Sequence, residues 1–110
     1  MVTDPNGGAL FQVDERKLLT LLQDLIRIPS VNPSLVPGGN GEADIARFIG
    51  GVLDEMGLVV RYQELGENRM NVIGVLRGTG GGKNLMLNGH IDTVGVDGMS
   101  IEPFLPIYED

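Results

Sequence analysis

The segment LMLNGH, residues 85–90, most constrains the fold, because it is apolar enough to be a central strand of a sheet. Two segments before it, LVVRYQEL at 58–65 and NVIGVLRG at 71–78, are also rich in strand-forming residues. The sequence GTGGGK at 78–83 predicts a flexible hairpin turn ahead of the third strand. The last residues, PIYED, predict the start of a fourth strand.

Two helices are expected before these strands. The segment ERKLLTLLQDLIRI, residues 15–28, has leucines at the helical period and follows Asp14, a typical helix cap. The segment EADIARFIGGVLDEMGL, residues 42–58, predicts a second helix that ends at Gly57. Gly50 and Gly51 inside it cost up to about 2 kcal/mol relative to alanine. We interpret the pair as a place of close packing against the sheet; a break in the helix is the alternative.

Length, composition and charge narrow the class of protein. The 110 residues predict a single unit over 13–110 after a lead-in over 1–12, and the element order predicts an α/β layered fold. A net charge of -7, with 5% aromatic residues and no tryptophan, argues against nucleic-acid binding. The absence of cysteine excludes disulfides and thiolate metal sites. No apolar run reaches the roughly 20 residues of a membrane span, so a cytoplasmic protein is expected.

The glycine-rich turn does not match a phosphate-binding loop. Aligning the Walker pattern on Gly82 and Lys83 puts Arg77 at the first glycine position and Asn84 at the hydroxyl position. A phosphate loop also opens a helix, whereas this one leads into an apolar segment. We therefore interpret it as a turn.

His90, the single histidine, is the strongest candidate for a metal ligand. It ends an apolar strand, and Asp92 lies two residues further on, so both side chains are expected on the same side. Ligands collect at the carboxyl ends of strands in open α/β sheets. A metal-bound imidazole also needs a carboxylate or carbonyl to fix its tautomer, and Asp92 could supply one. The alternative is an ordinary surface or core histidine.

The run LMLNGHIDTV, residues 85–94, resembles the first metal-ligand signature of the zinc aminoacylases. That family includes acetylornithine deacetylase, succinyl-diaminopimelate desuccinylase, glutamate carboxypeptidase and aminoacylase. The resemblance extends to IRIPSVNPS at 26–34, the helix over 42–58, the strand over 71–76 and the sequence EPF at 102–104. It covers nearly the whole chain from about Val13 and is strongest to the acetylornithine deacetylase and desuccinylase branch.

The resemblance implies a three-layer α/β/α catalytic domain, of which this chain would hold the opening helices and first strands, without the smaller dimerisation domain. His90 would bind one of two zinc ions, or cobalt or manganese, and Asp92 would orient its imidazole. In such enzymes the two metals activate a bridging water that hydrolyses an N-acyl amino acid or a dipeptide. The parent enzymes are expected to be homodimers.

One recognisable ligand falls short of the about three that a catalytic zinc needs. The chain is therefore expected to be an N-terminal fragment of a metal-dependent amidohydrolase that is inactive by itself. Glu102, Glu109 and Asp110 are further carboxylates, but their spacing favours a solvated loop and strand end. The alternative function is a non-catalytic binding or self-associating module with a decayed metal site, because open strand edges promote association.

Overall fold

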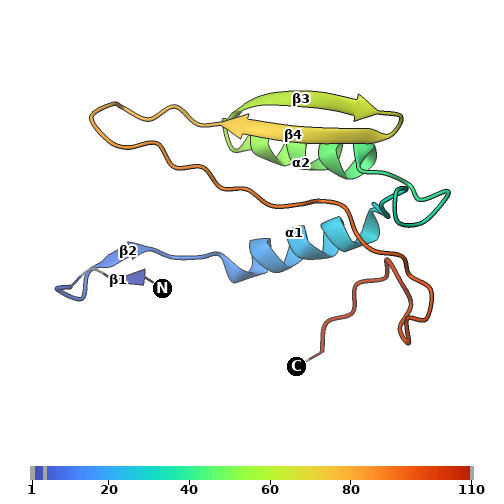
Figure 1. Ribbon diagram of the computed structural model, residues 1–110. Coiled ribbons are helices and arrows are strands. Elements are labelled where there is room, and N and C mark those ends of the chain that lie inside the picture. The colour runs from blue at the N-terminus through green and yellow to red at the C-terminus, as the bar shows by residue number, and fades with distance from the viewer. Residues whose placement is uncertain (1, 4, 110) are drawn as a thin grey trace. The chain divides into compact units, whose positions relative to one another are not determined.

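The computed structural model describes residues 2–3 and 5–109 and shows a mixed α/β protein. It divides into two compact units, residues 1–27 with 104–110 and residues 28–103, which are described separately. Among the described residues, no helix is long and apolar enough to cross a membrane. The elements in chain order are β1 (Val2–Thr3), β2 (Ala9–Phe11), α1 (Glu15–Arg27), α2 (Ala43–Glu55), β3 (Val59–Gly66) and β4 (Arg69–Val75) (Figure 1).

The first unit contains α1 and a short antiparallel pair of strands, β1 and β2. The predicted cap of α1 is confirmed, because Oδ1 of Asp14 accepts a hydrogen bond of 3.0 Å from the backbone N–H of Lys17. The pairing of β1 with β2 lies within the predicted lead-in and was not expected from its sequence. Met1 and Asp4 of that lead-in lie outside the described residues.

The second unit is built from α2 packed on the β3–β4 hairpin (Figure 1). The strands pair antiparallel, with Tyr62 opposite Val72 and Val60 opposite Gly74. Alternate residues of β4 face the helix, and Met70 joins the buried core. The core comprises Ala43, Ala46 and Met70, with Val72 and Ile91 packed against it. Both strands of this hairpin were predicted.

The glycine pair in α2 divides into two different environments. A Cβ at Gly50 would overlap the hydroxyl and ring of Tyr62 in β3, so this glycine permits the close packing that was predicted. A Cβ at Gly51 would meet nothing within 4 Å. The helix is continuous through both residues, and Gly57 follows it with a φ of +85°. The break in the helix is therefore excluded.

The predicted third strand over 85–90 does not form. In the described part of the chain, the sheet of this unit has only β3 and β4, and Leu85, Met86 and Leu87 are exposed. A buried central strand needs a neighbour on each edge and cover on both faces, which one hairpin and one helix do not supply. The turn over 78–83 consequently starts no second hairpin, and residues 106–109 form no strand either.

Candidate metal-ligand site

The site forms where the loop over 30–41 meets the segment over 90–93, both in the second unit. Val31 and Thr93 make an isolated parallel bridge. The N–H of Asn32 donates to the carbonyl of Thr93 at 2.9 Å, and the N–H of Thr93 donates to the carbonyl of Ser30 at 3.0 Å. Asn32 precedes Pro33, which biases its backbone towards the extended conformation that such pairing requires. Two segments far apart in sequence are thus held side by side.

Gly41 brings this loop against the turn of the β3–β4 hairpin. Its φ is +75°, and a Cβ there would overlap the carbonyl of Asn68. The N–H of Gly41 donates to the carbonyl of Val31 at 3.0 Å. The Asn68 carbonyl accepts the N–H groups of Glu42 and Ala43 at 2.8 and 3.1 Å, and so satisfies donors at the start of α2 that have no side-chain cap.

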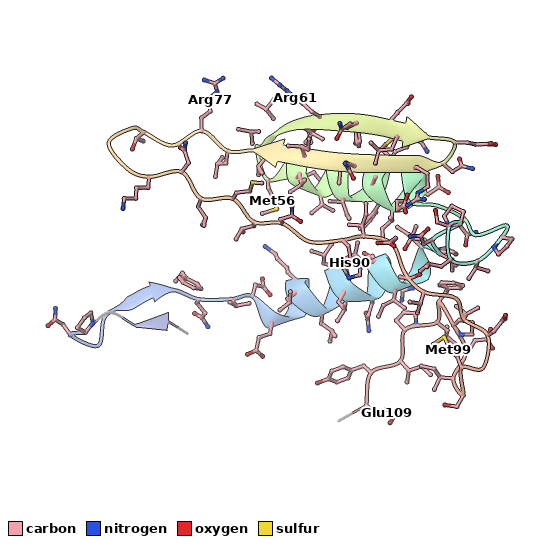
Figure 2. All side chains as sticks on the ribbon, viewed as in Figure 1. Met56, Arg61, Arg77, His90, Met99 and Glu109 are labelled. Carbon is pink, nitrogen blue, oxygen red and sulfur yellow. The ribbon has the colours of Figure 1, made fainter. Side chains whose placement is uncertain are left out.

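His90 and Asp92 lie on the same side of their segment, as predicted, while Ile91 between them packs against the core. Nδ1 of His90 is 3.2 Å from Oδ1 of Asp92 and 3.0 Å from its backbone oxygen. Both partners are acceptors, so a neutral imidazole carries its proton on Nδ1 and its lone pair on Nε2. The His90 side chain is 86% exposed and stands on the extended chain that follows β4 (Figure 2).

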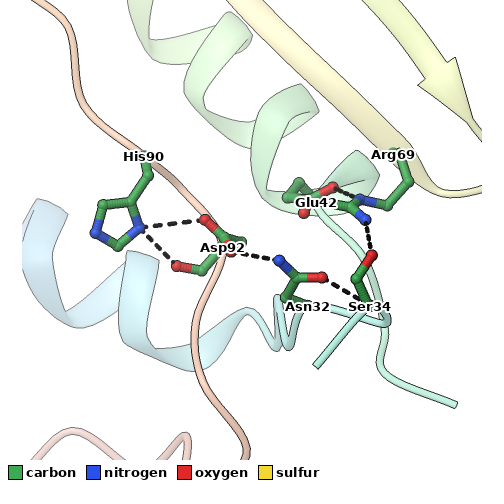
Figure 3. A network of polar contacts seen from close by, with 6 residues as sticks. All are labelled: Asn32, Ser34, Glu42, Arg69, His90 and Asp92. Carbon is green, nitrogen blue, oxygen red and sulfur yellow. Dashed lines mark hydrogen bonds and ion pairs between the residues drawn. The ribbon is translucent and has the colours of Figure 1, made fainter. Parts of the chain in front are cut away.

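Asp92 is held from its other side by Asn32. The amide Nδ2 of Asn32 donates a hydrogen bond of 2.8 Å to Oδ2 of Asp92 (Figure 3). This bond is the main cause that lowers the pKa of the Asp92 carboxyl below its ordinary value, opposed by partial burial and aided by the nearby His90. The carboxylate therefore stays charged and available to the imidazole at neutral pH.

Polar contacts continue from Asn32 to α2 and β4 (Figure 3). Oδ1 of Asn32 accepts the N–H of Ser34 at 2.8 Å, and the hydroxyl of Ser34 accepts from Arg69 at 3.0 Å. Arg69 also donates to the buried carboxylate of Glu42 at 2.7 Å. The ion pair between Glu42 and Arg69 was not expected from the sequence. The sequence Asn-Pro-Ser signals a turn but does not reveal its partner sixty residues away.

In the part of the chain that the structure describes, one imidazole lies with its carboxylate partner and no further candidate ligand completes a metal site. Among residues 2–3 and 5–109, no three His, Cys, Asp or Glu side chains gather so that they could hold a metal ion. Neither Glu102 nor Glu109 completes such a group. Asp110 lies outside the described residues. The roles of His90 as a ligand and Asp92 as its orienting group remain predictions.

Comparison with known proteins gives one relative of known activity. The chain is 37% identical over 92 residues to an N-formyl-4-amino-5-aminomethyl-2-methylpyrimidine deformylase of Halalkalibacterium halodurans. The match covers 80% of this chain and 21% of that protein, so the chain spans about a fifth of the length of this curated relative. No family model and no solved structure matches the chain.

Proposed function

We propose that the chain supplies a metal ligand, His90, and its orienting carboxylate, Asp92, to a hydrolase that removes an acyl group from an amide nitrogen. The observation that carries the proposal is the hydrogen bonding of Nδ1 to Asp92, which leaves the exposed Nε2 with a lone pair. The similarity to a deformylase supports hydrolysis of an N-acyl bond. The resemblance of residues 85–94 to zinc aminoacylases supports the metal.

The His90 imidazole, with Asp92 on its Nδ1, fits zinc, with cobalt or manganese as alternatives. A neutral imidazole nitrogen is among the ordinary zinc ligands, and an oriented ring is what such ligation requires. Bound there, zinc would polarise the amide carbonyl and lower the pKa of a bound water. One protein ligand among the described residues is too few for catalysis, so we expect no turnover from the isolated chain.

The substrate class is an amide whose hydrolysis releases a free amine. By the resemblance to acetylornithine deacetylase, we propose an N-acyl amino acid or a dipeptide. The matched relative acts on an N-formyl aminomethylpyrimidine, which makes a formamide the second candidate. An assay distinguishes these two substrate classes by their products, because an amino-acid product carries a carboxylate next to the amine and the pyrimidine product does not.

The proposal is tested with a chimera in which the matched residues of this chain replace the corresponding segment of the deformylase. We expect the zinc-loaded chimera to hydrolyse an amide in a panel of N-formyl and N-acetyl substrates, and His90→Ala to abolish turnover. Arg77→Ala, a substitution of an exposed residue outside the site, is the control. Full activity of a correctly folded His90→Ala chimera would show that His90 is not a ligand. No hydrolysis by a folded, zinc-loaded chimera would overturn the deacylase assignment.

A further inference from the structure

Asn32 connects Asp92 to the loop over 30–41 through both polar atoms of its side chain. Nδ2 donates to Oδ2 of Asp92, and Oδ1 accepts from the N–H of Ser34, each at 2.8 Å. If the Asn32 amide were turned over, its oxygen would face the Asp92 carboxylate and its NH2 group would face the Ser34 N–H. Both hydrogen bonds would then be lost. The orientation of the amide is therefore fixed by its two neighbours.

The backbone fixes the distance across which Asn32 reaches Asp92. The two backbone hydrogen bonds that make up the bridge between Val31 and Thr93 hold the two segments together next to this contact. Arg69 ties the loop to the start of α2, because it donates to the hydroxyl of Ser34 and to the buried carboxylate of Glu42. The Asn32 amide is thus presented to Asp92 from an anchored loop.

The two oxygens of Asp92 have different partners. Oδ2 receives the amide of Asn32, and Oδ1 lies 3.2 Å from Nδ1 of His90 (Figure 3). Rotation of the carboxylate would move both oxygens together, so the bond to Asn32 opposes any rotation that takes Oδ1 away from the imidazole. The bond from Asn32 therefore determines where Oδ1 lies, which is one of the two Asp92 oxygens that Nδ1 of His90 meets, the other being the backbone oxygen at 3.0 Å.

We propose that Asn32 is a positioning residue for His90: by holding Oδ2 of Asp92 it keeps Oδ1 on Nδ1 and, together with the Asp92 backbone oxygen, keeps the lone pair of the imidazole on Nε2. The consequence for metal binding rests on the proposed function, whereas the consequence for the tautomer does not. A purely structural Asn32 would shape the turn at Ser34 without affecting the imidazole.

The experiment is nitrogen-15 NMR of the whole chain with labelled histidine, which gives a single imidazole because the chain has one histidine. Spectra are recorded near pH 8.5, about two units above the ordinary imidazole pKa. In the unaltered chain we expect a protonated Nδ1 and an unprotonated Nε2. In Asn32→Ala we expect both resonances to move towards the average of the two tautomers. Asn71→Ala, which removes an amide that donates to the exposed Gln63, should leave both resonances unchanged.

Two further variants separate positioning from loss of the loop. Asn32→Asp keeps the oxygen that accepts from Ser34 but cannot donate to Asp92, so the tautomer should shift although the turn is retained. The double variant Asn32→Asp with Asp92→Asn exchanges donor and acceptor and should restore the protonated Nδ1. An unchanged tautomer in folded Asn32→Asp, or an equal shift in Asn71→Ala, would overturn the proposal.

Adding zinc to the same samples distinguishes this inference from the proposed function. We expect a selective shift of the Nε2 resonance in the unaltered chain and a weaker shift in Asn32→Ala. If the tautomer follows Asn32 but zinc leaves Nε2 unmoved, the positioning role stands and the metal assignment fails. If zinc binds equally well to both chains and the tautomer is the same in both, the positioning role fails and the metal assignment stands.

Discussion

Substituting alanine for Gly51 should stabilise the protein, whereas the same change at Gly50 should not, although the two glycines are neighbours in α2. Alanine is favoured over glycine inside a helix by about 1 kcal/mol. A Cβ at Gly51 meets nothing within 4 Å, so Gly51→Ala should gain this full amount. A Cβ at Gly50 overlaps three atoms of Tyr62, and overpacking of this kind costs about 1–3 kcal/mol. Gly50→Ala should therefore range from nearly neutral to about 2 kcal/mol destabilising.

The comparison between the two variants isolates the packing against Tyr62, because the gain in helix propensity is common to both. Thermal unfolding followed by circular dichroism should separate their midpoints, with about 4–8 °C expected for each kcal/mol in a unit of this size. In a Tyr62→Ala background, Gly50→Ala should become stabilising, as Gly51→Ala already is. Equal shifts of Tm for the two variants in the chain that retains Tyr62 would refute the packing of β3 on α2 described above.

Three further predictions concern the site and the exposed segment. Asn32→Ala should raise the pKa of Asp92 towards its ordinary value of about 3.9, as measured by carbon-13 NMR titration. The hydrogen bond from Asn32 to Asp92 stabilises the folded chain above a pH of about 3.9, and this stabilisation is lost as the pH falls through the lower pKa that Asp92 has in the folded chain. Arg69→Met should lower the urea midpoint of unfolding, because it leaves the Glu42 carboxylate buried without its partner. The loss in free energy of unfolding should be smaller than the about 3–5 kcal/mol of a fully buried pair, because the Arg69 side chain is 30% exposed. Leu87→Glu should reduce concentration-dependent association in sedimentation experiments; association equal to that of the unaltered chain would rule out this exposed apolar segment as its cause.

The helices and the β3–β4 hairpin could be predicted because their signals are local. Apolar residues at the helical period, the cap at Asp14 and the glycine after α2 act over a few residues, and the structure confirms each of them. The hairpin strands likewise needed only each other and the helix. Residues 85–90 were wrongly predicted as a strand. Their apolar side chains indicate that a strand there would have to be buried, but whether a strand forms depends on partner strands elsewhere in the chain.

At the site, the sequence predicted the short-range pair and missed the long-range contact. In extended backbone, residues two apart point to the same side, which was enough to predict that His90 and Asp92 lie together. Nδ1 of His90 is 3.2 Å from Oδ1 of Asp92. The contact between Asn32 and Asp92 depends on a loop that folds back over sixty residues of chain. The turn signal at Asn32 predicts the local backbone shape, but it does not predict that Asp92 lies beside it.

The carbonyl of Asn68 has a consequence for where this protein can be modified. Exposed hairpin turns are ordinarily good places for inserted tags or loops. The turn between β3 and β4 is a poor choice, because moving the Asn68 carbonyl would release the N–H groups of Glu42 and Ala43. It would also disturb the loop that carries Asn32. The glycines at 78 and 80–82 have no atom within 4 Å of a built Cβ, so a fluorophore or affinity tag belongs there.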